Sequence, residues 1–337
     1  MRSDAAGARN RKGERVEGVA ARVERWWFAA GEPRLSVLDV GLIACFVSVL
    51  LVGTWFAESF FTERNVSNLL RQIVANGLIS LGMLLVILTG GIDLSVGSLV
   101  ALGGVLFAGM TDQLGIGPAL CIAIACGAVA GMVNGVIIAR FKLQSFIVTL
   151  ATMGIVRGCV FLYTEIPISP AHADFRDLGA TLVGAMPVSM IIMLGCYALV
   201  WFYLNRTTVG RATVAIGGNE ETVRLAGVNV GRTIVLAYVL SGAFSALSGA
   251  ILVSRLGIAQ PSLGIAYELD AIAACVIGGA VLGGGGGGVP GTLFGVFTLG
   301  LINNLLNLVG VKSFYQDIVK GTVIILAVLL VAKRRTG

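Results

Sequence analysis

The stretch QIVANGLISLGMLLVILTGGIDLSVGSLVALGGVLFAGMT, residues 72–111, contains two long apolar runs separated by two glycines and one acid. Each run, at 72–89 and 94–111, comes close to the 20 or so apolar residues that a helix needs to cross a bilayer. Glycines can break a membrane helix, and an acid at membrane depth normally faces a cavity or a partner. The stretch therefore predicts membrane helices with an interruption between them.

The composition of the whole chain agrees with a membrane location. Of its 337 residues, 56% are hydrophobic and 12% are charged, whereas soluble domains are about 45–50% apolar and about 25% charged. This composition excludes an ordinary cytosolic enzyme, a disordered protein and a nucleic-acid binder. We predict an all-α polytopic membrane protein with about ten transmembrane helices. The remaining apolar runs lie at about 36–57, 117–138, 146–163, 183–204, 233–254, 269–282, 291–309 and 316–332.

The positions of the basic residues predict the orientation of these spans. The first 35 residues carry eight Lys or Arg and no long apolar run. With ten spans, 17 of the 24 basic residues fall on the side of this segment, and the positive-inside rule makes that side cytoplasmic. We therefore expect two parts: a basic cytoplasmic segment at 1–35 and a transmembrane domain at 36–337, with both termini in the cytoplasm.

The loop at about 205–232 is the longest connection between predicted spans, and it lies on the cytoplasmic side. It contains the patterned segment GNEETVRLAGVN, residues 218–229. Asn219 can cap a short helix, Glu220 and Glu221 suit its first turn, and Gly227 can end it. The alternative is a simple solvated linker. We interpret the segment as a short surface helix shaped to dock a partner.

Polar groups between apolar runs indicate a pathway through the membrane. Gly90, Gly91 and Asp93 form the first interruption, although a tight turn at the membrane interface remains an alternative. A second acid-and-glycine segment runs from Tyr267 to Asp270 and on to the glycines at 278–279 and 283–288. The two interruptions suggest two related units flanking a common pathway. Arg157 and Arg255 also lie on apolar runs, and we expect them to snorkel toward the outer interface.

No catalytic or metal-binding constellation is recognisable. The six cysteines are scattered singly, and His172 is the only histidine, so a histidine-based site cannot form. The glycine run at 283–288 lacks the Lys-Ser/Thr ending of a phosphate-binding loop. We therefore expect no metal and no cofactor in this chain.

Several long motifs resemble one family. They are LTGGIDLSVGSLVAL (88–102), TLATMGI (149–155), GGNEETVRLAGVNV (217–230) and AQPSLGIAYELDAIAACVIGG (259–279). Together they resemble the membrane permease subunit of bacterial ABC importers for monosaccharides, and most closely the ribose permease group. The resemblance runs from about residue 62 to the end of the chain and implies the ABC importer permease fold.

The resemblance also implies partners and a location. Such permeases lie in the bacterial cytoplasmic (inner) membrane and act as dimers, pairing with a second permease copy. Each subunit docks on a cytoplasmic ATPase that binds the ATP, and a periplasmic or tethered sugar-binding protein delivers the sugar. The family's coupling segment corresponds to Gly218, Asn219, Glu220, Glu221, Thr222 and Gly227. Ribose-type relatives usually carry basic residues where this chain has 283–288, which leaves xylose, arabinose, galactose, rhamnose and autoinducer-2 open as substrates.

The expected function is sugar import by alternating access, with no bond chemistry in this chain. The residues expected to line or support the pathway are Gly90, Gly91, Asp93, Ser95, Asn134 and Asp270. One alternative is a solitary ion-coupled secondary carrier or channel for a small polar solute, since broken helices with an intramembrane acid also suit such proteins. A solitary carrier has no evident need for the patterned cytoplasmic loop. An integral-membrane enzyme is disfavoured because no cluster of His, Cys or acids lies at one membrane face.

Overall fold

The computed structural model describes residues 60–184 and 186–312, together with isolated helical residues between 46 and 55 and between 315 and 322. The predicted segment 1–35 and most of the runs at 36–57 and 316–332 lie outside the described residues. The long helices are α3 (Glu63–Leu88), α4 (Val96–Leu114), α5 (Ile116–Phe141), α6 (Ser145–Tyr163), α8 (Val188–Arg206), α11 (Val230–Leu256) and α13 (Val289–Leu308). The short elements are η2 (Ala173–Arg176), α7 (Asp177–Ala180), β1 (Leu182–Val183), β2 (Met186–Pro187), α9 (Thr208–Gly218), α10 (Glu220–Leu225) and α12 (Tyr267–Ile277).

The seven long helices are each long and apolar enough to cross a membrane. The prediction of an all-α polytopic protein is therefore confirmed. The predicted number of ten spans is not confirmed, because two of the expected runs lie mostly outside the described residues and the run at 269–282 forms only the short helix α12.

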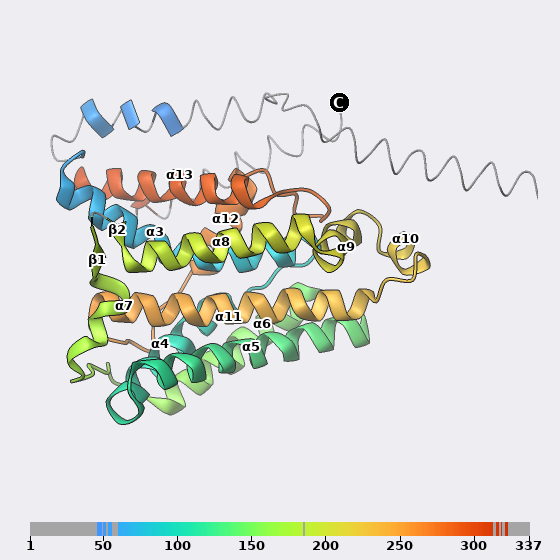
Figure 1. The fold of residues 1–337 in the computed structure, drawn as a ribbon, viewed down its shortest axis with the longest axis horizontal. Coiled ribbons are helices and arrows are strands. Elements are labelled where there is room, and N and C mark those ends of the chain that lie inside the picture. The colour runs from blue at the N-terminus through green and yellow to red at the C-terminus, as the bar shows by residue number, and fades with distance from the viewer. Residues whose placement is uncertain are drawn as a thin grey trace, which may run out of the picture. The chain divides into compact units, whose positions relative to one another are not determined.

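Helix α11 lies between α3 on one side and α5 on the other, with α4 also packed against it (Figure 1). Glycines allow these close approaches. Gly127 and Gly131 on α5 face the backbone of Gly242 and Tyr238 on α11, and Gly103 on α4 faces the backbone of Ala246. Small residues are what membrane helices use to bring their backbones together.

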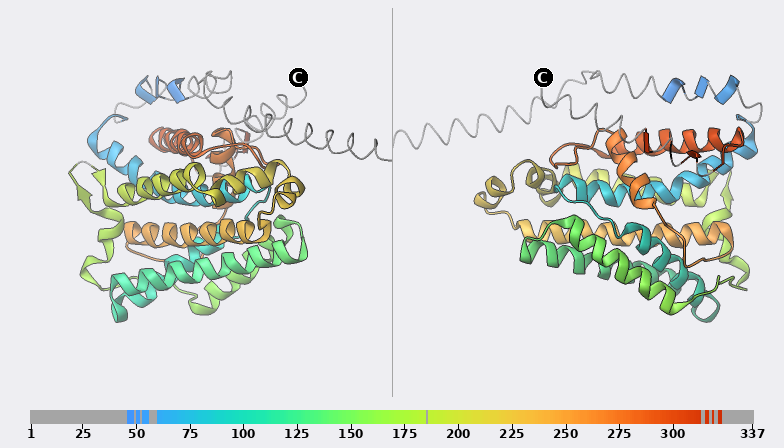
Figure 2. Two further views of the ribbon diagram at one scale, coloured as in Figure 1. Left: turned by 45° about the vertical axis from the view of Figure 1, so that its right-hand side comes forward. Right: turned by 180° about the vertical axis from the view of Figure 1, so that it is seen from behind.

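The two ends of the bundle carry different short elements, and the views in Figure 2 show them on opposite sides. Helices α9 and α10 lie at one end, which we call the α9–α10 end. The two-stranded antiparallel hairpin of β1 and β2, with η2 and α7, lies at the other end, which we call the hairpin end.

The expectation of a full helical span at 269–282 is wrong. Helix α12 has 11 residues, about 17 Å, and therefore cannot cross a hydrocarbon core of about 30 Å by itself. It ends at Gly278, and Gly279 takes a positive φ of 85°. The glycine-rich loop 278–288 then leads toward the α9–α10 end, where the Gly285 N–H donates to the Leu88 carbonyl over 3.2 Å.

Candidate functional site

The predicted short helix in the long loop is present as α10. The Asn219 side chain caps it by accepting a 2.9 Å hydrogen bond from the Thr222 N–H. Glu221 and Arg224, one turn apart, form an ion pair of 2.7 Å. Hydrogen bonds from Arg224 hold the pKa of the Glu221 carboxyl below its usual value, so the pair is intact at neutral pH and is lost only in more acid solution. Gly227 ends the segment with a φ of 83°.

Helix α10 is anchored on one side and open on the other. Val223 is buried and packs with Ile216 of α9 and Val230 of α11. Glu220 and Glu221 are exposed, and Leu225 is 79% exposed. A small element with an apolar anchor and an acidic free face is suited to dock a protein partner and to pass its movement to α9 and α11.

Three glycine segments meet where α9 ends, and we call this meeting point the glycine junction. It consists of Gly90, Gly217 and the pair Gly284–Gly285. A Cβ on Gly284 would lie 2.6 Å from the Gly217 Cα and 2.9 Å from the Gly90 Cα, which is closer than real side chains approach. A Cβ on Gly217 would overlap the Leu88 carbonyl oxygen and the Gly285 nitrogen. The junction therefore links the α9–α10 segment directly to the turn after α3 and to the glycine-rich loop.

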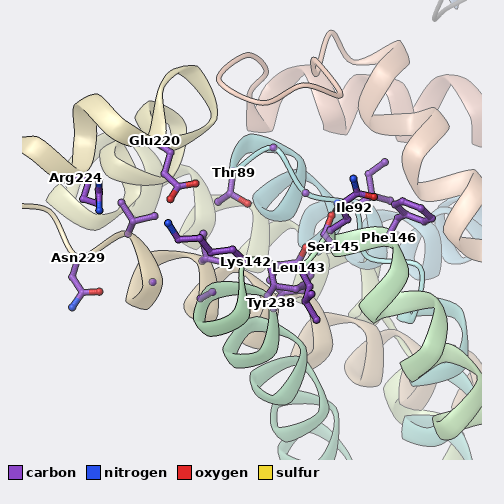
Figure 3. Close-up of a pocket in the computed structure, with 18 of the residues that line it drawn as sticks. Thr89, Ile92, Lys142, Leu143, Ser145, Phe146, Glu220, Arg224, Asn229 and Tyr238 are labelled. Carbon is purple, nitrogen blue, oxygen red and sulfur yellow. Dashed lines mark hydrogen bonds between the residues drawn. The ribbon is translucent and has the colours of Figure 1, made fainter.

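A cavity of about 800 Å³ lies between the turn after α3, the α5–α6 connection, α10 and the start of α11 (Figure 3). Its lining includes the charged side chains of Lys142, Glu220 and Arg224. Gly91, Ser145 and Tyr238 line it as well. The cavity therefore borders both α10 and the first interruption of the membrane helices.

The interruption at 89–95 is held in place by side chains of α6. The Ile92 N–H donates to the Ser145 Oγ over 3.0 Å, and the Leu94 N–H donates to the Thr149 Oγ1 over 3.1 Å. These bonds satisfy backbone groups that no helix pairs, which is the condition for irregular backbone within a membrane.

Asp93, Ser95 and Asn134 are brought together in one buried network. The Asp93 carboxylate is fully buried and accepts bonds from the Ser95 Oγ (2.6 Å), the Ser95 N–H (3.0 Å) and the Ser241 Oγ (2.8 Å). The Asn134 amide donates to Ser95 and its carbonyl accepts from Thr152. These side chains therefore fasten α4, α5, α6 and α11 to one another.

The depth of this network argues against a simple interfacial turn. Ser241 lies 11 residues beyond Val230, the first residue of α11, which is about 16 Å along the helix.

Of the six predicted pathway residues, Gly90 and Gly91 line the cavity. Asp93, Ser95 and Asn134 form the buried network, and Asp270 lies apart from both, buried in the first turn of α12.

Sequence reasoning missed the role of Arg157, and the expectation that it snorkels to the interface is wrong. Its guanidinium donates to the carbonyls of Pro261 (2.7 Å), Leu263 (2.8 Å) and Gly97 (3.4 Å). Arg157 thus ties the segment between α11 and α12 to the start of α4. The signal available in the sequence was its spacing of four and eight residues from Met153 and Thr149, which places all three on one face of α6.

Replacing Asp93 with asparagine should lower stability and uptake together. The substitution replaces one of the two carboxyl oxygens, which accept from Ser95 and Ser241, with an NH2 group that cannot accept, and an unsatisfied buried polar group costs about 1–3 kcal/mol. The measurement is the melting temperature of the purified protein beside the uptake per permease molecule. An unchanged melting temperature with reduced uptake per molecule would instead place Asp93 on the pathway itself.

Comparisons with known proteins show the family of the chain. Residues 65–328 match the family described as branched-chain amino acid transport system / permease component. The chain is 48% identical over 297 residues to the ribose import permease protein RbsC of Bacillus subtilis (strain 168), covering 87% of this chain and 92% of that protein. No solved structure matches the chain.

Two further relatives are named as import permeases, one for ribose and one for galactose and methyl galactoside. Over 300 residues the chain is 44% identical to the ribose import permease protein RbsC of Escherichia coli (strain K12), covering 87% of this chain and 93% of the relative. It is 39% identical over 318 residues to the galactose/methyl galactoside import permease protein MglC of the same organism, covering 88% and 95%.

The apolar helices and the relatives define a multi-pass transport permease rather than an enzyme. The chain belongs to the family of permease components of ABC import systems described above. It is a multi-pass protein of the inner membrane, and as such a permease it works with an ATPase and a substrate-binding protein.

Proposed function

We propose that this chain is the permease subunit through which an ATP-driven importer moves ribose or a related monosaccharide into the cytoplasm. The observation that carries the proposal is the position of α10: it joins the glycine junction through α9 and lines the cavity beside the interrupted helices. The names of the relatives, which are import permeases for ribose and galactose, support the substrate class. The basic residues support cytoplasmic termini.

In this mechanism the ATPase moves α10 when it binds ATP, and the movement reaches the membrane through two routes. Val223 and Val230 connect α10 to the start of α11. Gly217 connects α9 to Leu88 and to Gly285. A partner shifts a conformational equilibrium only if it binds the two states with different free energies, so the contacts of α10 must differ between the inward-open and outward-open states.

Replacing Glu221 with arginine should uncouple the ATPase. The change breaks the pair with Arg224 and puts two like charges one turn apart on the exposed face of α10. We expect sugar uptake to fall about tenfold or more, while the amount of permease in the membrane stays normal. Uptake by whole cells, normalised to the membrane content of the permease, is the measurement. The equivalent change at Glu220 should act in the same direction, and normal uptake in both variants would refute the coupling role.

The exposed face of α6 supports the proposal that the permease forms a dimer with a second copy of itself. Only 22% of the apolar window of α6 is buried, and Gly154 and Gly158 are exposed with open space where a Cβ would stand. Glycines spaced by four residues let two membrane helices approach closely. We therefore place the second copy against α6.

Replacing Gly158 with leucine should weaken this dimer without disturbing the subunit. The leucine points into open space in the single chain but separates the two helices at a close contact. The measurement is the mass of the permease in lipid nanodiscs, which should shift from dimer to monomer. The control is leucine in place of Gly195, which is also exposed with open space but lies on α8. A dimer that persists in the Gly158 variant would rule out α6 as the interface.

The function is tested by gentle extraction of a tagged chain from its native membrane. We expect an ATPase to co-purify in roughly equal amounts, and we expect its activity to rise when a sugar-loaded binding protein is added. The sugar that gives the rise identifies the substrate. A chain that purifies alone and moves sugar without ATP would be a solitary carrier, and the proposal would fail.

A further inference from the structure

The segment between α11 and α12, residues 257–266, is irregular backbone that starts at the hairpin end, where Ala259 pairs with Ile168, and then runs along the membrane helices α4 and α6. Arg157, which binds its carbonyls at 261 and 263, lies six residues before Tyr163, the end of α6, a distance of about 9 Å along the helix. Further along the segment, Gly264 packs against the Gly97 carbonyl and the Val100 side chain. Irregular backbone at such depth is tolerated only where protein covers it or where it lines a water-filled space.

Polar side chains on this segment are not covered by protein. Gln260 and Ser262 are exposed, and Arg157 and Glu268 are partly exposed. Glu268 and Arg157 attract each other electrostatically. A lipid-facing position for these groups is costly. We call Gln260, Ser262 and Glu268 the polar edge.

Apolar groups accompany the polar edge. Ile265 is 67% exposed and Leu269 is 53% exposed, and Ala266 between them takes a positive φ of 66°. A carboxylate, an amide and a hydroxyl beside aliphatic side chains match a monosaccharide, which has hydroxyl groups on its rim and C–H bonds on its ring faces. The residue types favour a neutral polyol over an ion, because Glu268 lies close to the positive charge of Arg157.

We propose that the polar edge is a sugar-contact surface of the translocation pathway, held in position by Arg157 and reached from the hairpin end. This proposal rests on the proposed function. Arg157 is a positioning residue here, because its three hydrogen bonds go to backbone carbonyls of the two segments that it joins. The polar edge touches the sugar briefly as the sugar passes.

The test uses the reconstituted importer and measures sugar transported per ATP hydrolysed for the variants Gln260→Leu and Glu268→Gln. We expect transport per ATP to fall about fivefold or more, roughly 1 kcal/mol, with the stimulation of ATPase activity by the loaded binding protein unchanged. The control is Gln113→Leu, the same substitution at an exposed residue near the end of α4. Unchanged transport in both variants overturns the proposal. A parallel fall of transport and ATPase stimulation also overturns it, since the edge would then dock the binding protein.

A labelling experiment keeps the proposal testable if those variants fold poorly. In a chain whose other exposed cysteines are replaced by alanine, Ser262→Cys should react with a membrane-impermeant maleimide, and reaction should slow when the loaded binding protein and sugar are added. Leu199→Cys, on the exposed face of α8, is the lipid-facing control. Equal, slow labelling of both positions overturns the proposal. A wild-type importer whose ATPase ignores every loaded binding protein would refute the proposed function instead.

Discussion

Replacing Gly217 with alanine is expected to abolish sugar uptake. The added Cβ would overlap the Leu88 carbonyl oxygen and the Gly285 nitrogen, both of them backbone atoms that cannot rotate away as a side chain can. Overpacking commonly costs about 1–3 kcal/mol, and here relief requires α9 to move away from α3 and from the glycine-rich loop. That movement breaks the connection between α10 and the interrupted helices. We expect uptake per permease molecule to fall more than about tenfold.

The measurement for Gly217→Ala is uptake together with the amount of folded permease in the membrane. Gly195→Ala is the control, because it also adds a Cβ to a helix but in open space, where alanine favours the helix by about 1 kcal/mol. Uptake at the normal rate in the Gly217 variant would show that the glycine junction has room for the added Cβ. Equal loss of protein and uptake would assign the junction to folding alone.

Replacing Arg157 with leucine should have the second large effect. Leucine keeps the apolar bulk of the side chain but leaves the carbonyls of Pro261 and Leu263 without their donor. An unsatisfied buried polar group costs about 1–3 kcal/mol, so the segment 257–266 should shift to find other partners. We expect sugar transported per ATP to fall about tenfold or more.

A structural and a positioning role for Arg157 are separated by the lysine variant. Arg157→Lys keeps the positive charge, but one ammonium group cannot reproduce the planar fork of a guanidinium. We expect the lysine variant to restore a normal amount of folded protein while transport per ATP stays reduced. Full recovery of both quantities would mean that charge alone is needed at this position.

The sequence predicted the local features of α10 well. Asn219 caps α10, Glu220 and Glu221 lie in its first turn, and Gly227 ends the segment, because capping depends on residues only three or four positions apart. The break after α3 was also predictable, since Gly90 and Gly91 stand between two apolar runs. The run at 269–282 was the weakest of the ten expected spans because it is short and ends in glycines, and it forms only the 11-residue helix α12.

Contacts between distant residues could not be predicted in the same way. Asp93 was expected to line or support the pathway, and nothing near it in the sequence indicates its partner Ser241, which lies 148 residues away. Arg157 was expected at the interface, but its partners are carbonyls more than 100 residues further along the chain. Neither hydropathy nor spacing indicates which backbone groups an interruption leaves unpaired. The glycine junction likewise depends on three segments that meet only in the folded chain.

The central claim, ATP-driven sugar import through this permease, is tested most directly in proteoliposomes that hold ATP inside and contain the permease with its ATPase. Labelled ribose and related monosaccharides are added outside with the binding protein. We predict that one of these sugars accumulates inside only when ATP, the ATPase and the loaded binding protein are all present. Sugar entry that proceeds at the same rate without ATP, or with the permease chain alone, would contradict the claim.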